Sequence, residues 1–310
     1  MSKLSARPPE TATVYDVDPG RSEFRRIRGL RYHLRRHAAP ATPADAPLLF
    51  LLHGWLDVSA GWAPVIARLL PRLQVIAPDW RGLGYTQWAP GGYWFHDYLA
   101  DFDAIADACA PGRRFLLAGH SMGAQVAGLY AGLRPQRIEK LILLDGLMLP
   151  DMPPQRAPER VGNWLQQLRR PFAARIYPSF SELARRIAAH HPRLSPAGAD
   201  FVARCWGHRE IDGRVRLLAD PRHYLHGPLL YRSAEAEQIW RQVTAPTLMV
   251  RAGESEYRGS IAEIELQRRY TCFRDHRVAE LPGVGHMLHY EAPQATAAAL
   301  AEFLFASACV

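Results

Sequence analysis

Cysteine, lysine and long apolar runs are all scarce in this chain of 310 residues. The four cysteines are scattered and contain no C-x-x-C pair: Cys109, Cys205, Cys272 and Cys309. This distribution argues against a disulfide framework or a zinc site. No apolar run approaches the roughly 20 residues that a membrane-spanning helix needs, and residues 1–10 lack the apolar segment of a secretory signal. We therefore expect a cytoplasmic protein without a membrane span.

Acidic residues are in deficit, with 30 Asp and Glu against 38 Lys and Arg, which gives a net charge of +8. A basic balance can indicate a nucleic-acid partner. Here the positive charges are spread along the chain, and arginine supplies nearly all of them because Lys3 and Lys140 are the only lysines. The pattern therefore argues against a nucleic-acid partner.

What the chain does contain is a repeated alternation of short apolar segments with helical patterns. Such alternation is typical of a mostly parallel sheet covered by helices on both faces, because parallel strands are buried on both sides. The sequence therefore predicts an α/β fold with eight strands, at 13–17, 23–34, 48–52, 75–77, 115–118, 139–144, 246–251 and 277–281. The turn between the first two strands is placed at Asp18-Pro19-Gly20, a strong turn signal.

The alternation stops at Leu149 and resumes at Pro246. Residues 149–235 are rich in proline, arginine and aromatic residues and contain no apolar strand. Helical patterns occur near 158–169, 179–190 and 196–206. We therefore predict a core of residues 1–148 and 236–310 that is interrupted by a helical insertion, residues 149–235.

The most informative motif is Gly119-His120-Ser121-Met122-Gly123, which fits G-x-S-x-G. It lies between an apolar strand pattern and a helical run of small residues. At such a turn the serine adopts a strained backbone conformation, and the flanking glycines remove Cβ atoms that would clash. The hydroxyl of Ser121 is then presented near a helix N-terminus, which favours negative charge. The motif predicts a nucleophilic serine.

Further landmarks accompany this motif in a fixed order. His53-Gly54 follows the third predicted strand, Asp79-x-Arg81-Gly82-x-Gly84 the fourth, and Gly283-x-Gly285-His286 the last. Together they resemble the α/β-hydrolase superfamily over nearly the whole chain. The stretch His53-Gly54-Trp55-Leu56-Asp57 is similar to a group described as serine hydrolase-like. The resemblance implies an α/β-hydrolase fold whose helical insertion forms a cap.

The resemblance implies a catalytic triad with Ser121 as the nucleophile and His286 as its base, with His289 as the local rival. Two carboxylates are candidates for the acid. Asp145 at the end of the sixth strand is favoured, and Glu256, in the loop after the seventh strand, is the alternative because most of the family places the acid there. Either carboxylate would fix the imidazole tautomer and stabilise the imidazolium.

The oxyanion hole is expected to use the backbone N–H groups of Trp55 and Met122. Aromatic residues near the insertion are expected in part to line an acyl pocket: Trp88, Tyr93, Trp94, Phe95, Trp164, Phe172, Tyr177 and Trp206. No metal or organic cofactor is implied.

The resemblance therefore implies a serine hydrolase that cleaves an ester or related acyl bond of a small molecule through an acyl-enzyme. A C–C bond hydrolase or a thioesterase with the same triad is the alternative, because one fold hosts many reactions. A non-catalytic binding protein on this fold is a further alternative, against which the Ser121 and His286 pair argues.

Overall fold

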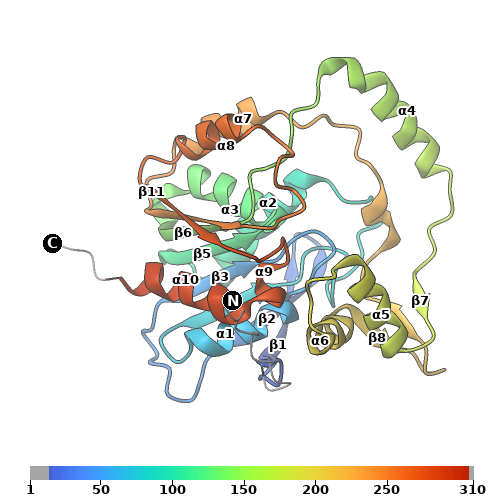
Figure 1. Ribbon diagram of the computed structural model, residues 1–310, viewed down its shortest axis with the longest axis horizontal. Coiled ribbons are helices and arrows are strands. Elements are labelled where there is room, and N and C mark those ends of the chain that lie inside the picture. The colour runs from blue at the N-terminus through green and yellow to red at the C-terminus, as the bar shows by residue number, and fades with distance from the viewer. Residues whose placement is uncertain (1–13, 307–310) are drawn as a thin grey trace, which may run out of the picture.

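An eight-stranded sheet forms the centre of the computed structural model, which describes residues 14–306 (Figure 1). The strands are Arg21–Ile27 (β1), Leu30–His37 (β2), Leu48–Leu52 (β3), Gln74–Pro78 (β4), Phe115–His120 (β5), Ile138–Leu144 (β6), Thr247–Ala252 (β10) and His276–Leu281 (β11). Their order is β1-β2-β4-β3-β5-β6-β10-β11. Strand β2 is antiparallel to β1 and β4, and the remaining pairs are parallel. The predicted α/β fold is confirmed.

Helices cover both faces of this sheet. The helices next to it are Ala63–Leu69 (α1), Phe95–Cys109 (α2), Met122–Leu133 (α3), Ser233–Trp240 (α7), Glu263–Tyr270 (α8), Leu288–Glu291 (α9) and Pro293–Phe305 (α10). In Figure 1, α1 and α10 lie below the sheet, whereas α2, α3, α7 and α8 lie above it. The fully buried strand β3 serves both layers, because successive side chains of a strand point to opposite faces. Phe50 packs with the α2–α3 layer, and Leu49 and Leu51 pack with the α1–α10 layer.

The turn that joins the first two strands differs from the sequence prediction. It lies at Arg28 and Gly29, whose φ angles are 44° and 86°. A two-residue hairpin turn of type I′ needs positive φ at both positions, which glycine tolerates best. Asp18-Pro19-Gly20 also forms a local turn, in which the Gly20 N–H donates to the Asp18 carboxylate, but this turn precedes β1. Residues 14–20 contain no strand, and Thr13 lies outside the described residues.

Residues 149–235, here called the insertion, connect the neighbouring strands β6 and β10. Three helices match the predicted ranges: Ala157–Leu168 (α4), Phe180–His190 (α5) and Pro196–Trp206 (α6). The expectation of no strands was wrong, since a small sheet has the order β7-β9-β8. Its strands are Ile176–Tyr177 (β7), Gly207–Arg209 (β8) and Val215–Leu217 (β9). Strands of two or three residues are too short to show an alternating pattern.

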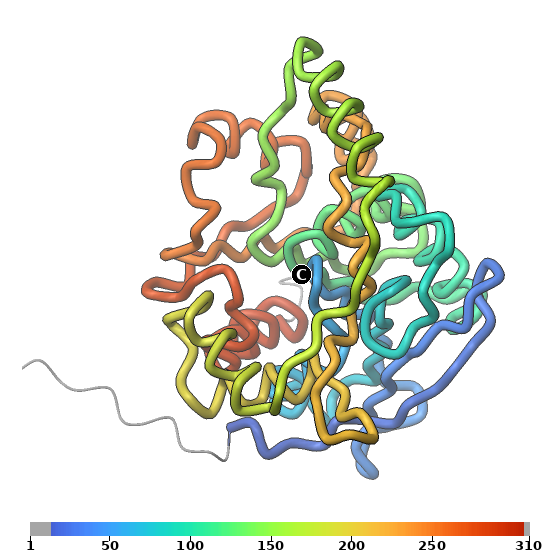
Figure 2. The backbone as a smooth tube through the Cα atoms, turned by 90° about the vertical axis from the view of Figure 1, so that its right-hand side faces the viewer, coloured from blue at the N-terminus to red at the C-terminus, as the bar shows by residue number. Residues whose placement is uncertain are grey.

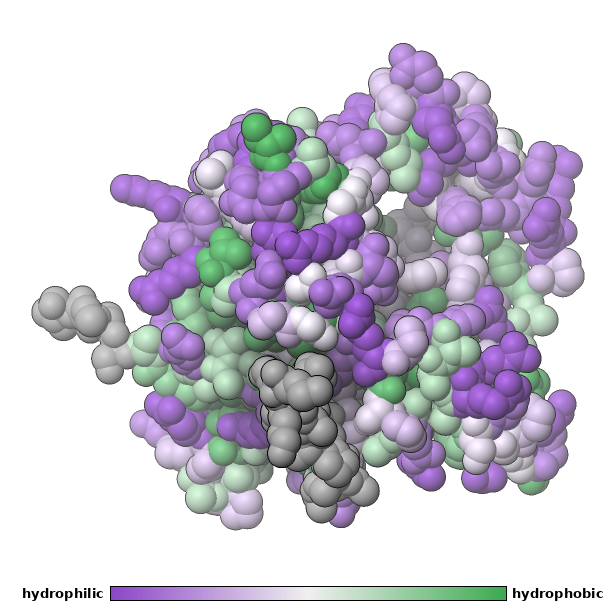
Figure 3. All heavy atoms as spheres, in the orientation of Figure 1, coloured by the Kyte–Doolittle hydropathy of each residue, from purple (hydrophilic) through white to green (hydrophobic). Residues whose placement is uncertain are grey.

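The insertion extends along one side of the molecule, and Figure 2 looks onto that side. Helix α4 lies beside residues 221–231, where the Gln167 amide oxygen accepts from the His226 N–H at 2.9 Å. Figure 3 shows mainly hydrophilic residues on the face that it presents, including the region of α4 at the upper right. Helix α7 begins at Ser233, two residues before the expected end of the insertion, and packs on α3.

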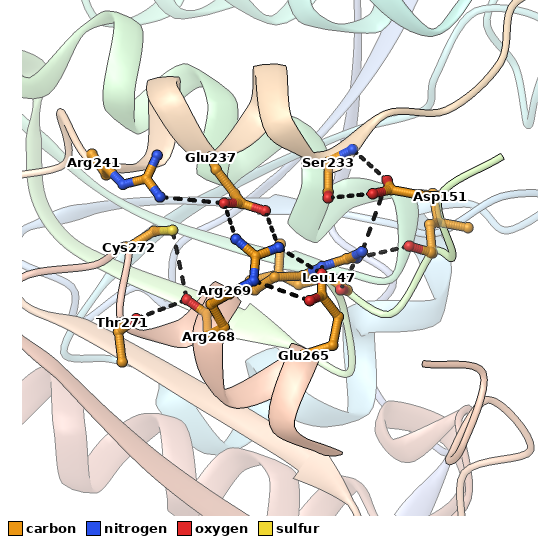
Figure 4. A network of polar contacts seen from close by, with 11 residues as sticks. Leu147, Asp151, Ser233, Glu237, Arg241, Glu265, Arg268, Arg269, Thr271 and Cys272 are labelled. Carbon is orange, nitrogen blue, oxygen red and sulfur yellow. Dashed lines mark hydrogen bonds and ion pairs between the residues drawn. The ribbon is translucent and has the colours of Figure 1, made fainter. Parts of the chain in front are cut away.

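A buried arginine holds the chain as it leaves β6. Arg269 on α8 is 1% exposed, and one of its nitrogens donates to the carbonyls of Leu147 and Leu149 at 2.8 and 2.7 Å. Figure 4 shows this guanidinium beside Glu265, which accepts from Arg269 Nε at 3.1 Å. The same network joins α7 to α8 through Glu237 and Arg268. The first residues of the insertion are therefore fixed to the core.

Within residues 14–306, no helix is both long enough and apolar enough to cross a membrane.

We predict that the protein loses stability as the pH falls from about 6.5 toward 4. Burial is the main cause that lowers the pKa of both His37 and His223 to about 4. The native state therefore binds fewer protons than the unfolded state within this window, and its stability rises with pH there. Each histidine contributes roughly 2 kcal/mol to the loss between pH 7.5 and 5. Urea unfolding across this pH range measures it.

In the variant His37→Gln, one titrating group is removed and the free energy of unfolding should depend less steeply on pH. His208→Gln serves as the control, because His208 is exposed, and it should keep the slope of the parent. Equal slopes for the parent and both variants would contradict the assignment.

Candidate active site

Ser121 occupies a strained turn between β5 and α3. Its φ and ψ angles are 52° and −115°, a conformation that is rare for a residue with a side chain. The flanking glycines permit the turn. A Cβ on Gly119 would lie 2.2 Å from the Gly123 carbonyl oxygen, and one on Gly123 would lie 2.3 Å from that of Leu52. The helix therefore begins in direct backbone contact with the end of β3.

The loop after β3 lies against this turn. An ideal Cβ on Gly54 would lie 3.3 Å from the Ser121 Cβ, so no side chain separates the two segments. Within residues 14–306 the backbone N–H groups of Trp55 and Met122 donate to no acceptor. Two free donors of this kind beside a serine can stabilise an oxyanion.

His286, from the loop after β11, is hydrogen-bonded to Asp145. Its Nδ1 lies 2.7 Å from the Asp145 Oδ2, and both side chains are buried. The same carboxylate accepts from the Ser255 hydroxyl at 2.6 Å and from the Ala252 N–H at 3.0 Å. Three donors therefore fix the carboxylate and, through it, the imidazole ring.

Ser121 and His286 line the same cavity. No hydrogen bond joins them among the described residues, and bonds of this kind often tighten only when substrate binds. Because Nδ1 of His286 faces Asp145, its Nε2 is the nitrogen left for the serine. The Tyr257 ring packs on the same imidazole in a T-shaped arrangement, with 4.5 Å between the two ring centroids.

Glu256, the alternative acid, also lines the cavity but forms no hydrogen bond with His286 or any other described residue. Glu254 is exposed and pairs with Arg193 at 3.3 Å. Of the carboxylates considered from the sequence, only Asp145 contacts the His286 imidazole. Ser255, which supports that carboxylate, was missed because a lone serine in a loop carries no signal.

A second buried carboxylate, Asp57, connects the core to the insertion. It accepts from His289 Nε2 at 2.9 Å, from the Tyr290 hydroxyl at 2.5 Å and from Trp206 Nε1 at 2.9 Å. Burial alone would raise the pKa of Asp57, but the hydrogen bonds from His289 and Tyr290 outweigh it and hold the pKa well below its usual range. The Asp57 carboxylate therefore fixes the loop after β3 to the end of α6.

His289, the rival base, is therefore engaged with Asp57 and stacks on Trp62. His120 lies between the rings of His286 and His289, with centroid distances of 4.6 and 4.7 Å. Burial and the two neighbouring imidazoles lower the pKa of His120 well below its usual value. A neutral His120 donates from Nε2 to the His286 carbonyl at 2.8 Å and so helps to hold that loop.

Among the described residues, Asp57, His120 and His289 are the group that lies close enough together to be considered as metal ligands. Their ligand atoms lie within 4.8 Å of one another. The Asp57 oxygens already accept three hydrogen bonds, and all three side chains are at most 1% exposed. We assign this grouping a structural role.

A cavity of about 530 Å³ opens above Ser121. Its walls combine the loop after β3, the serine turn, the His286 loop and the insertion. Of the eight aromatic residues expected from the sequence, only Tyr177 and Trp206 line it. The other aromatic lining residues are Trp55, Tyr224 and Tyr257. Sequence reasoning missed Tyr224 and Tyr257 because tertiary contacts bring them there.

The sheet order, the strained serine turn and the histidine–carboxylate pair are the features of a hydrolase of the α/β type. The family model described as alpha/beta hydrolase fold matches residues 47–293, and the chain belongs to this family.

The individual proteins that this chain resembles share only about a quarter of its residues. A serine hydrolase-like protein of Danio rerio is 25% identical over 84% of this chain and 82% of its own. The 2-(acetamidomethylene)succinate hydrolase of Mesorhizobium japonicum is 28% identical over 84% of this chain and 88% of its own. A solved structure of a hypothetical protein from Pseudomonas aeruginosa PAO1 superposes with a TM-score of 0.77 and 28% identity, over 91% of this chain and 99% of that one.

We predict that Asp57→Ala destabilises the fold by about 3 kcal/mol or more, because three donors, two of them on buried side chains, lose their acceptor. Chemical unfolding measures the loss. Asp212→Ala is the control, because Asp212 is exposed in a turn, and it should unfold like the parent. Similar unfolding curves for the two variants would refute a structural role for Asp57.

Proposed function

We propose that this protein is a serine hydrolase that cleaves an ester or a related acyl bond through an acyl-enzyme. The observation that carries the proposal is the hydrogen bond of 2.7 Å between His286 Nδ1 and Asp145, in a cavity that also contains Ser121. Asp145 is the proposed acid, in preference to Glu256.

In the proposed reaction His286 Nε2 takes the proton of the Ser121 hydroxyl as its oxygen attacks the substrate carbonyl. The oxyanion that forms accepts hydrogen bonds from the backbone N–H groups of Trp55 and Met122. Asp145 stabilises the imidazolium, which then gives its proton to the leaving alkoxide. Water, activated by the same histidine, attacks the acyl-serine and releases the acid.

We further propose that the insertion acts as a cap on the core of residues 1–148 and 236–310. Leu183, Ile187 and Trp206 of the insertion line the cavity together with Ser121. Substitution of such residues would therefore change the selectivity among acyl chains.

A second candidate is the hydrolysis of a bond other than an ester, such as the amide bond of an acetamido compound, by the same residues. The observation in its favour is the Mesorhizobium japonicum relative, which is named as a hydrolase of 2-(acetamidomethylene)succinate and aligns along 84% of this chain. A parallel assay with that compound and with p-nitrophenyl esters distinguishes the two candidates.

We predict that Ser121→Ala lowers the turnover of p-nitrophenyl esters by at least about 10³-fold, because the nucleophile is lost. A fluorophosphonate probe should label the parent protein and not the variant, and unfolding curves should show that the variant is folded. Hydrolysis by the variant within tenfold of the parent would exclude Ser121 as the nucleophile, and an unlabelled parent would favour a binding protein.

We predict that Asp145→Asn lowers turnover by at least about a hundredfold, because the imidazolium loses its counter-charge and the tautomer is no longer fixed. Glu256→Gln is the matched control: it removes one charge from the same cavity but no contact with His286, and it should cost less than tenfold. Steady-state kinetics of the two variants make the comparison. A larger effect at Glu256 would reverse the assignment of the acid.

A further inference from the structure

Two positive and two negative side chains line the cavity, and they differ in how far their charges are already paired. Four are formally charged: Asp57, Arg175, Arg186 and Glu256. Asp57 is 1% exposed and saturated with donors from His289, Tyr290 and Trp206, so its carboxylate is not available to a ligand.

The two arginines of the cavity differ in their partners. Arg186 pairs with Glu182 at 3.2 Å, although Glu182 also pairs with Arg185 at 2.7 Å. Arg175 forms no ion pair with any residue of 14–306, and its guanidinium lies 4.2 Å from the centre of the Tyr224 ring. Arg175 therefore brings to the cavity wall a positive charge with which no described carboxylate forms an ion pair.

The position of Arg175 is set by the small sheet of the insertion. Its carbonyl accepts from the Leu217 N–H at 3.0 Å, and the next residue begins β7. The Tyr224 ring beneath its guanidinium packs edge-on to Trp55 at 5.6 Å, beside the proposed oxyanion hole. The charge is therefore held on the insertion side of the cavity.

We infer that the substrate carries an anionic group, a carboxylate on its acyl portion, and that Arg175 is the specificity-determining residue that binds it. This inference rests on the proposed function and narrows it to acyl substrates with a terminal negative charge. A guanidinium matches a carboxylate with two parallel hydrogen bonds. The cavity wall also contains aliphatic side chains, among them Leu217 and Leu218, which provide no competing polar partner.

The test compares p-nitrophenyl hemisuccinate and hemiglutarate with the uncharged p-nitrophenyl pentanoate. The parent should prefer the anionic esters in kcat/KM. Arg175→Gln should lower this preference by about tenfold or more, the loss expected for one charge-assisted hydrogen-bonded pair. Most of the loss should lie in KM, and Arg175→Lys should retain part of the preference.

Arg185→Gln is the matched control. It removes the same charge from the same insertion, but Arg185 does not line the cavity, so the preference should stay within twofold of the parent. An equal loss in both variants would mean that only the general positive field matters, which would overturn the role of Arg175. A parent without preference for the anionic esters would overturn the inference itself.

Two further measurements distinguish a failure of the anion site from a failure of the proposed function. Butyryl-coenzyme A carries phosphate on its leaving group, and an Arg175 effect confined to this thioester would overturn the assignment to an acyl carboxylate. Isothermal titration of Ser121→Ala with hemiglutarate and pentanoate esters reports binding without turnover. Selective binding of the hemiglutarate ester by this variant, combined with no hydrolysis by the parent, would reject the proposed function and retain the anion site.

Discussion

The hydrogen bond between Asp145 and His286 spans 141 residues of sequence and depends on the order of the strands. Strand β6 delivers the aspartate, β11 is followed by the histidine loop, and β10 lies between them. The Asp145 N–H donates to the Val250 carbonyl at 2.7 Å. This backbone hydrogen bond fixes the turn to β10 independently of the Asp145 carboxylate. A carboxylate held this rigidly orients an imidazole more precisely than one on a free loop.

Backbone strain concentrates around the same edge of the sheet. Ser121, Asp145, Leu56 and Leu147 all have φ between 44° and 67°, a region that costs residues with side chains energy. Close packing sustains these conformations. Gly123 lets α3 touch the end of β3, and Arg269 fixes the Leu147 carbonyl. The stability of the buried core therefore maintains a site whose own backbone is unfavourable.

The insertion gives this common fold an individual cavity. Trp206 connects it to Asp57, and hence to the loop that carries Gly54 and Trp55. A change in the position of α6 would therefore reach the proposed oxyanion hole through one buried carboxylate. The insertion also supplies Arg175, which lines the cavity and forms no ion pair with any residue of 14–306. In the proposed function, the residues at the sheet edge carry out the reaction and the insertion selects the substrate.

Local patterns in the sequence determined the apolar strands, the glycine-flanked serine turn and the three helices of the insertion, because each is encoded within a few adjacent residues. The position of the first hairpin turn was predicted wrongly, since two turn signals lie ten residues apart and only strand pairing selects between them. Strands β7, β8 and β9 were not foreseen, because two or three residues show no periodicity. The contact of His286 with Asp145 in place of Glu256, and the gathering of Tyr224 and Arg175 around Trp55, were decided only by the tertiary structure. Each of these depends on distances between segments far apart in the chain, which packing sets and local sequence does not record.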